Sequence, residues 1–387
     1  MPLPPEKPQP DWDPRSGAVL ADQIAAYDAM RRRCPVAYSD YLGWSLFRHA
    51  DVVRALDDHD TFSSAVSSHL SVPSGMDPPR HTAYRRLIER HFEPRRVAAF
   101  EPPCRAISAD LAAGLEKGVE IDLVARLARP FAVRVQCAYL GWPAALHEPL
   151  LRWVRRNHEA TLARDTEAMA AVALEFDGYI GDLLAERIAA GDAAPDDITT
   201  ELLRQEVDGR PLDHDEIVSV LRNWTVGELG TIAACVGILA HRLAADPRLQ
   251  RRLRDEPGLL PAAIDEILRM HAPLVANRRV TTRAVEIGGR RIAAGERVTL
   301  LWASANRDEA VFGDPDELRL DRDPAQNLLY GSGIHVCPGA GLSRLELRLV
   351  MEELLQATRW IDPAPGREPT RAIYPASGFS ALPLLLS

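Results

Sequence analysis

One stretch of the sequence, residues 213–245, predicts a helix far longer than usual. Asp213 followed three residues later by Glu216 is the pattern of a capping box, and Asp246-Pro247 ends the helical pattern. A helix of about 30 residues spans ~45 Å, whereas the mean helix has about 12 residues. A helix this long and apolar crosses a protein through its core, so the fold must be arranged around it.

The middle of this helix contains residues that are costly in a helix interior. Gly227, Glu228 and Gly230 lie between Thr225 and Thr231. Glycine loses about 1 kcal/mol relative to alanine there, and a buried carboxylate needs a partner. Two interpretations remain open: a tolerated kink packed on a neighbour, or a groove over a ligand.

The remaining pattern predicts a mainly α fold with a small β portion. Helix-forming residues dominate from Arg95 to Met270, and residues 191–195 read as a loop between helices. The clearest strand signals lie between Arg279 and Val298, around Gly288-Gly289. Residues 1–20 are rich in proline and are expected to form an extended arm, followed by a single domain over residues 21–387.

Composition excludes several classes of protein. The net charge is −9, so nucleic acid is not expected as a partner. The longest apolar run, residues 231–240, is about half of what a bilayer requires, and the N-terminus has no signal-peptide pattern. The five cysteines are scattered without a CxxC pair, which fits a reducing compartment. We therefore expect a cytoplasmic protein that contacts neither nucleic acid nor membrane.

The segment from Tyr330 to Gly341 surrounds one cysteine, Cys337, with four glycines. Glycine lets the backbone approach a flat ligand and adopt positive φ. A helical pattern begins at Leu342, so Cys337 is expected near a helix N-terminus, where the dipole and backbone N–H groups lower a thiol pKa. Such a thiolate suits the axial position of haem iron. The alternative is a buried structural cysteine in a glycine-rich turn.

This segment resembles the cysteine-ligand loop of cytochrome P450 monooxygenases, whose pattern is aromatic-Gly-x-Gly-x-His/Arg-x-Cys-x-Gly. Tyr330 in place of the usual Phe and Pro338 after the cysteine are mild departures. Other family segments occur in the same order, from about residue 20 to the end of the chain: His81-x-x-x-Arg85, Glu266-x-x-Arg269, residues 305–308, residues 312–315 and Arg322. The resemblance implies the P450 fold, haem b (iron protoporphyrin IX) and monooxygenase activity.

The resemblance also assigns roles to individual residues. Cys337 would ligate the haem iron, in a loop that Gly331 and Gly339 shape. The haem propionates would be bound by His81, Arg85, Arg279 and His335. Glu266, Arg269 and Arg322 would form a structural network, although a Glu-Arg pair at this spacing is otherwise a weak surface ion pair. Likewise, without the resemblance each of the four propionate-binding candidates would be interpreted as a charged side chain in contact with solvent.

The long helix departs from the family at one point. In the family an acid directly precedes the threonine that corresponds to Thr231, and the two relay protons during oxygen activation. Here Gly230 stands at the acid's position, and Glu228 stands where glycine is usual. Glu228 and Thr231 are three residues apart and share a helix face. Glu228 is therefore a candidate for the displaced acid; the alternative is that it pairs with an arginine.

By family position, the substrate pocket is expected to be lined by Trp224, Gly227, Leu274, Val275, Asn277 and Phe379. The expected reaction inserts one atom of O2 into a small organic molecule, by hydroxylation or heteroatom dealkylation. Residues 222–228 and 336–339 also resemble the haem domains of self-sufficient bacterial P450s, which are fused to a reductase. Since this sequence ends at Ser387, we expect electrons from a separate ferredoxin and ferredoxin reductase. Arginines behind Cys337 would dock the acidic donor or else be merely solvated: Arg85, Arg86, Arg95, Arg344 and Arg348.

Two other functions remain open at this point. The missing acid at Gly230 motivates a peroxide-driven haem-thiolate oxygenase, or other P450 chemistry that is not monooxygenation. A non-catalytic P450-like partner protein is the remaining alternative; such a protein is expected to lack residues such as Cys337 and Arg85, which this sequence has.

Overall fold

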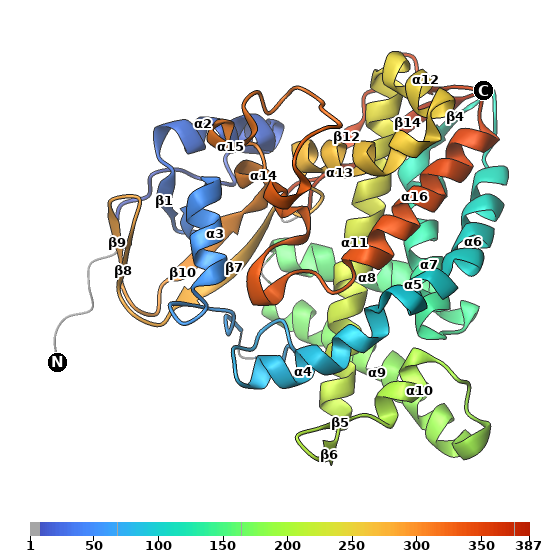
Figure 1. The fold of residues 1–387 in the computed structure, drawn as a ribbon, viewed down its shortest axis with the longest axis horizontal. Helices are drawn as coiled ribbons and strands as arrows, with labels where there is room; N and C mark the ends of the chain where they lie inside the picture. The colour runs from blue at the N-terminus through green and yellow to red at the C-terminus, as the bar shows by residue number, and fades with distance from the viewer. Residues whose placement is uncertain (1–7, 68, 164, 375) are drawn as a thin grey trace.

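The computed structural model of the protein describes residues 8–67, 69–163, 165–374 and 376–387. Helices fill one side of the molecule, and strands with short helices fill the other (Figure 1). The helical side consists of α4 (Arg80–Glu89), α5 (Pro94–Ala99), α6 (Glu101–Ala113), α7 (Arg129–Leu140), α8 (His147–Ala163), α9 (Thr166–Ala190), α10 (Ile198–Leu203), α11 (His214–Ala245), α12 (Pro247–Asp255), α13 (Leu260–His271) and α16 (Ala340–Ala357).

The strand-rich side is built on a five-stranded sheet in the order β1-β2-β10-β7-β3, in which only β2 and β10 are parallel. Its strands are β1 (Val36–Ser39), β2 (Gly43–Leu46), β3 (Phe62–Ser63), β7 (Ala276–Thr281) and β10 (Arg297–Leu301). The hairpin of β8 (Val285–Ile287) and β9 (Arg290–Ile292) extends from it, as the glycine pair between them predicts. The helices on this side are α1 (Gly17–Ala21), α2 (Gln23–Arg33), α3 (His49–Asp57), α14 (Trp302–Ala305) and α15 (Glu309–Phe312).

Smaller sheets join the helical side. A three-stranded sheet has the order β11-β14-β4, and two further two-stranded ladders pair β12 with β13 and β5 with β6. These strands are β4 (Glu120–Asp122), β5 (Glu206–Val207), β6 (Arg210–Pro211), β11 (Ile361–Pro363), β12 (Thr370–Arg371), β13 (Phe379–Ala381) and β14 (Pro383–Leu386). Helix thus dominates the described residues, with small sheets, as the sequence predicts.

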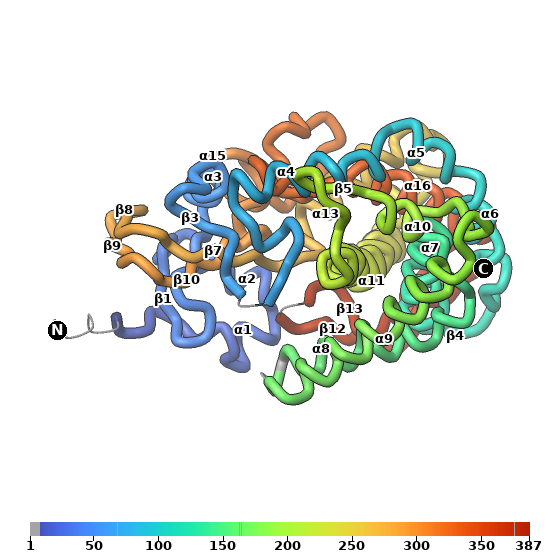
Figure 2. Tube along the Cα trace, turned by 90° about the horizontal axis from the view of Figure 1, so that it is seen from below, coloured from blue at the N-terminus to red at the C-terminus, as the bar shows by residue number. Residues whose placement is uncertain are grey.

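Helix α11 is the centre of the fold. It runs unbroken over 32 residues, with the predicted capping box of Asp213 and Glu216 at its start and Asp246 at its end. Figure 2 shows it end-on between the strand-rich side and the helices α7, α9 and α10. Among the described helices it is the one long and apolar enough to cross a membrane. However, 56% of its most apolar 18-residue stretch is buried inside the protein. Its buried apolar side chains belong to the main hydrophobic cluster, which identifies a core helix.

The N-terminal segment differs from the expected extended arm. Its first seven residues lie outside the described part of the chain. Residues 17–21 form α1, and the Trp12 ring is buried against Tyr27 and Phe47. The Asp11 carboxylate accepts hydrogen bonds from the Tyr38 N–H at 2.7 Å and from Arg290 at 2.7 Å. An apolar anchor and a charged tie therefore hold this segment on the sheet side.

Candidate functional site

The cysteine loop lies between two short helical turns, residues 328–330 and 333–335, and helix α16. The Cys337 N–H donates to the Tyr330 carbonyl at 2.8 Å, which closes the loop. Gly331 and Gly333 have φ of +75° and +69°, a region that side chains other than glycine rarely adopt. A Cβ on Gly333 would lie 2.7 Å from the Leu56 carbonyl oxygen. The glycine pattern is therefore a backbone requirement of this loop.

Gly339 lies beside the sulfur for a different reason. Its φ is −83°, so its conformation does not require glycine. A Cβ there would lie 3.5 Å from the Phe92 ring and 3.9 Å from Cys337 Sγ. The missing side chain keeps the surroundings of the sulfur open, and Cys337 itself is only half-buried.

The Cys337 thiol does not have the lowered pKa that its place before a helix predicts. Burial raises its pKa, and the hydrogen bond from the Gly339 N–H opposes this only in part. The negative charge of Glu228 raises it further. The expectation was wrong because desolvation, a property of the whole fold, outweighs the helix terminus. A bound metal ion favours the thiolate form of a coordinating cysteine and would act against this shift.

The middle of α11 has an exposed face at Val226, Gly227 and Gly230, which we call the bare wall of α11. Val226, Gly227 and Gly230 are exposed within a helix whose other faces are buried, and Thr231 is half-buried. A Cβ at either glycine would meet no atom within 4 Å. Thr225 is instead fully buried, where Gln136 donates to its hydroxyl at 2.8 Å. Because α11 is unbroken here, the structure favours the groove over the kink.

Four basic side chains gather near the loop. The rings of His81 and His335 lie 4.3 Å apart, and both Nε2 atoms are buried without a hydrogen-bond partner among the described residues. Burial and the neighbouring charges of His81 and Arg279 lower the pKa of His335 to about 3. Burial also lowers the pKa of His81 and of Arg279.

This cluster fits an anionic ligand. Arg279 is 7% exposed, yet among the described residues its guanidinium donates a hydrogen bond only to the carbonyl of its neighbour Arg278. Buried donors without acceptors are rare in folded proteins unless a ligand or water satisfies them. The carboxylates of a haem would supply those acceptors. With a half-buried cysteine in the loop and two exposed glycines on α11, the residues present fit the cofactor expected from the sequence.

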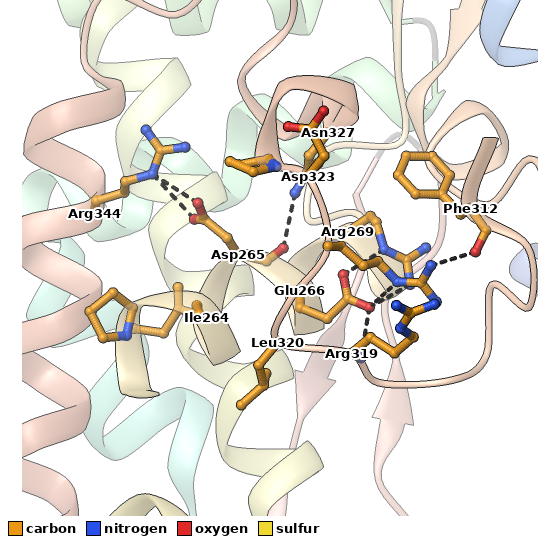
Figure 3. A pocket seen from close by; sticks show the side chains of 14 residues that line it. Ile264, Asp265, Glu266, Arg269, Phe312, Arg319, Leu320, Asp323, Asn327 and Arg344 are labelled. Carbon is orange, nitrogen blue, oxygen red and sulfur yellow. Dashed lines mark hydrogen bonds and ion pairs between the residues drawn. The ribbon is translucent and has the colours of Figure 1, made fainter. Parts of the chain in front are cut away.

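The predicted structural network is present and buried. Glu266 accepts two hydrogen bonds from Arg269, at 2.8 and 2.9 Å, and one from Arg322 at 2.8 Å (Figure 3). Arg269 is 1% exposed and also donates to the carbonyls of Asn306 and Pro315. Arg322 donates to the carbonyls of Phe312, Asp314 and Glu317. The network therefore ties α13 to the segment that leads to the cysteine loop.

A surface pocket of about 400 Å³ lies over this network, and Asp265 and Arg344 form an ion pair in its wall at 3.0 Å (Figure 3). None of the residues predicted to contact substrate lines it. Arg348 likewise pairs with Glu101 and Glu352, and Arg85 with Glu89. Three of the five arginines expected to form a basic docking face are therefore largely neutralised by acids.

The predicted substrate residues divide into three groups. Gly227, Leu274 and Asn277 are exposed, as a pocket wall requires. Trp224 packs against the rings of Phe92 and His91, and Phe379 lies 4.5 Å from the His241 ring. Val275 is 1% exposed and belongs to the core cluster of Tyr27 and Phe47, so its assignment to the pocket was wrong. Side chains alternate between faces in this extended segment, so Leu274 and Val275 point to opposite sides.

The sequence reasoning missed the partner of Glu228. Burial and the negative charge of Glu228 raise the pKa of Glu346 on α16, so the group that Glu228 faces is an acid. Among the described residues no arginine forms an ion pair with Glu228, so the alternative of an arginine partner was wrong. Glu346 is completely buried. A signal existed in the sequence: Glu346 lies on the apolar stripe formed by Leu342, Leu349 and Val350. An acid at an apolar position of a helix indicates a buried carboxyl.

Comparison with known proteins agrees with this geometry. Residues 142–383 match the family model "Cytochrome P450". The chain is 35% identical to the cyclomarin C epoxidase CymV of Salinispora arenicola, over 80% of this chain and 82% of that protein. It is 34% identical to the erythromycin C-12 hydroxylase of Saccharopolyspora erythraea, over 87% and 88%.

Among solved structures, the open form of cytochrome P450 EryK from S. erythraea superposes with a TM-score of 0.86. It is 31% identical and covers 95% of this chain and 97% of that one. Fold, motif order and relatives all lead to the same assignment. The chain therefore belongs to the cytochrome P450 family and is a bacterial haem-containing monooxygenase.

Proposed function

We propose that the protein inserts one oxygen atom from O2 into a small organic molecule, using electrons from a separate ferredoxin and ferredoxin reductase. One observation carries this proposal: near the half-buried Cys337 lie His81 and His335, whose buried Nε2 atoms have no hydrogen-bond partner among the described residues, and the buried Arg279. The similar proteins named above as an epoxidase and a hydroxylase support insertion of oxygen as the reaction.

The binding roles follow from placement. Cys337 would ligate the iron of haem b, which, when bound to a thiolate, supplies the chemistry that activates oxygen. His81, Arg85, Arg279 and His335 would hold its propionates through charge-assisted hydrogen bonds. Gly331 and Gly339 keep the loop and the surroundings of the sulfur free of side chains. Glu266, Arg269 and Arg322 act through structure only, because their hydrogen bonds saturate one another and nearby carbonyls.

Thr231 and Glu228 are proposed as the residues that hold and move protons. Thr231 is half-buried beside the bare wall of α11, and Glu228 lies one helical turn before it. A hydroxyl both donates and accepts hydrogen bonds, so Thr231 can pass a proton on. Glu228 replaces the acid that is missing at Gly230.

We further propose that residues 21–387 form one haem domain in the cytoplasm. All five cysteines are free, which fits a reducing compartment. The substrate would meet Gly227, Leu274 and Asn277, and an acidic electron donor would meet Arg86 and Arg95, which are exposed. Exposed arginines without acidic partners favour association with an anionic surface.

The proposed reaction is tested by comparing turnover driven by electron donors and O2 with turnover driven by hydrogen peroxide. A panel of small aromatic and heteroatom-containing substrates is incubated with NADH, a surrogate ferredoxin and its reductase, or with hydrogen peroxide alone. Product that depends on the electron donors supports monooxygenation. Product that forms mainly with peroxide supports the second candidate, a peroxide-driven oxygenase, which the glycine at position 230 favours. The spectrum of the reduced, carbon-monoxide-bound protein tests Cys337, since Cys337→Ser must abolish the thiolate signature.

The proton roles are tested separately. Glu228→Gln is expected to slow the donor-dependent reaction sharply, because the amide cannot supply a proton. Thr231→Ala is expected to lower the product formed per NADH. Unchanged rate and yield in either variant would remove that residue from the relay.

A further inference from the structure

A second pocket, of about 490 Å³, lies between α4 and the segment that connects α10 to the hairpin of β5 and β6. Figure 2 shows α4 beside β5. Both sides supply apolar residues to its lining, since Leu87 and Val207 belong to the main hydrophobic cluster. None of the residues assigned above to haem, substrate or the structural network lines it. It is a separate pocket, and its volume lies in the range of small-molecule sites, about 300–1,000 Å³.

Three arginines without partners line this pocket from its two sides. Arg86 and Arg90 lie four positions apart, about one helical turn, and Arg204 follows α10 on the other side. All three are exposed, and among the described residues none of them forms an ion pair or a side-chain hydrogen bond. By contrast, Arg210 on the same hairpin pairs with Glu216 at 2.6 Å. Like charges one turn apart repel each other, so the pocket gathers positive charge that the protein itself leaves unpaired.

The acids of the hairpin do not neutralise these arginines. Val207 is buried, so its neighbours Glu206 and Asp208 point to the opposite side of the strand, toward solvent. Both acids line the pocket and are exposed, but neither forms an ion pair with a described basic residue. Three cationic side chains against two anionic ones leave the pocket with a net positive charge.

Gln205 adds a hydrogen-bond acceptor that lacks a donor. Its Nε2 lies 2.9 Å from Nε2 of the fully buried His91. Because an amide nitrogen only donates, the histidine nitrogen accepts, and this bond fixes the orientation of the amide. The other end of the amide, Oε1, is buried and has no hydrogen-bond partner among the described residues. Buried acceptors are rarely left in this state, so a residue that lines the pocket calls for a donor from a ligand.

The chemistry of the lining selects the class of ligand. Guanidinium groups form paired hydrogen bonds with phosphate oxygens. A phosphate group presents its oxygens in several directions, so it can meet arginines on both sides of the pocket, whereas the two oxygens of a carboxylate lie in one plane. A hydroxyl group on the same molecule can donate to the unpartnered amide oxygen. The size of the pocket leaves room for both groups on one small organic molecule.

We propose that this pocket binds a small phosphate ester that carries hydroxyl groups. Arg86, Arg90 and Arg204 hold the phosphate, and a hydroxyl of the ligand donates to Gln205. One consequence rests on the proposed function: since Arg86 is one of the arginines proposed to meet the electron donor, a bound phosphate ester competes with that donor.

Calorimetric titration of the holoprotein at constant ionic strength tests the site without turnover. The probes are inorganic phosphate, n-butyl phosphate, which has no hydroxyl on its carbon chain, and ribose 5-phosphate. We expect all three to bind and ribose 5-phosphate to bind most tightly. Absence of binding by all three would overturn the site. Equal affinity for ribose 5-phosphate and n-butyl phosphate would overturn the role of the hydroxyl, and tighter binding of inorganic phosphate than of either ester would overturn the class of ligand.

Charge variants locate the binding. Arg204→Gln should weaken the binding of all three probes about tenfold, as loss of a charge-assisted hydrogen bond does. Glu206→Gln should tighten it, because one negative charge leaves the pocket. Arg95→Gln is the control, since Arg95 is exposed but does not line the pocket. Equal weakening by Arg95→Gln and Arg204→Gln would overturn the pocket in favour of a diffuse effect of surface charge.

The competition is measured separately. Ribose 5-phosphate at a concentration equal to its Kd should raise the ferredoxin concentration that gives half-maximal rate about twofold, and Arg204→Gln should reduce this effect. If the wild type gives no product with electron donors, the proposed function is wrong, while the titration still decides whether the pocket binds phosphate esters. If ribose 5-phosphate binds but leaves the dependence on ferredoxin unchanged, the competition is overturned.

Discussion

Arg85 donates a hydrogen bond to the carbonyl oxygen of Val336 at 2.6 Å, so helix α4 is tied to the residue directly before Cys337. The same guanidinium donates to Glu89 at 2.7 Å. Arg85 thus has two attachments before any ligand is bound. We infer that it positions the cysteine loop as well as serving the proposed haem site.

Replacing this arginine should loosen the loop. Arg85→Ala is expected to cost about 1.5–3 kcal/mol of stability, the range for a hydrogen bond from a charged group, and to reduce the haem retained after purification. Urea unfolding and the ratio of haem to protein absorbance measure both effects. Arg86→Ala, an exposed arginine one residue along the same helix, is the control. Equal haem retention in the two variants would contradict the role given to Arg85.

The buried network of Glu266, Arg269 and Arg322 should be sensitive to loss of its single acid. Glu266→Gln leaves the buried guanidinium of Arg269 and the partly buried one of Arg322 without a counter-charge, and breaking a buried ion pair in this way costs about 3–5 kcal/mol. Urea unfolding monitored by circular dichroism provides the measurement. Arg319→Ala removes an exposed arginine that pairs with Asp321 beside the network and should leave the unfolding midpoint unchanged. A wild-type midpoint for Glu266→Gln would show that the network carries no stability.

Acid should weaken the start of α11. Hydrogen bonds from Arg210, Tyr84 and the Asp213 backbone hold the pKa of Glu216 at about 2, below the value of ~4.3 in an unfolded chain. The stabilisation is therefore present above that unfolded value and is lost as the pH falls toward 2.

We expect Glu216→Gln to lose ~1–2 kcal/mol at neutral pH, since Arg210 is exposed and water screens the pair. The difference from the wild type should shrink as the pH falls. Urea unfolding across this range, with Glu206→Gln on the neighbouring strand as control, measures it. A difference that does not change with pH would contradict the assigned pKa.

An acid placed at position 230, where the family usually has one, should supply protons in place of Glu228. A side chain at Gly230 would meet no atom within 4 Å of its Cβ, so Gly230→Asp can be accommodated. In a Glu228→Gln background we expect this change to raise the donor-dependent product rate by about 10-fold. Gly230→Asn, of the same size but without the acid, should give no rescue. Equal rates for Asp and Asn would show that the missing acid does not limit the reaction.

Local signals in the sequence predicted the elements that local interactions determine. The start and end of α11 follow from Asp213, Glu216 and the Asp246-Pro247 stop, all within a turn of the helix ends. The hairpin at Gly288-Gly289 and the turns at Gly331 and Gly333 were readable for the same reason.

Features that depend on distant parts of the chain were not readable. Glu346 lies 118 positions beyond Glu228 in the chain, and only the packing of α11 on α16 brings their helices together. The raised pKa of Cys337 reflects burial by several elements, which outweighs the neighbouring helix terminus. The inward direction of Val275 likewise depends on the register of its strand segment against the core.

The two exposed glycines on α11 have a consequence for attempts to raise the thermal stability of this protein. Each glycine weakens the helix by about 1 kcal/mol relative to alanine, and neither Gly227 nor Gly230 has a neighbour that an added methyl group would strike. Alanine at both positions should therefore raise the melting temperature while filling the wall on which the proposed reaction depends. Variant libraries screened by heat alone will enrich for this change, so a thermostable form must be selected with turnover as a second criterion.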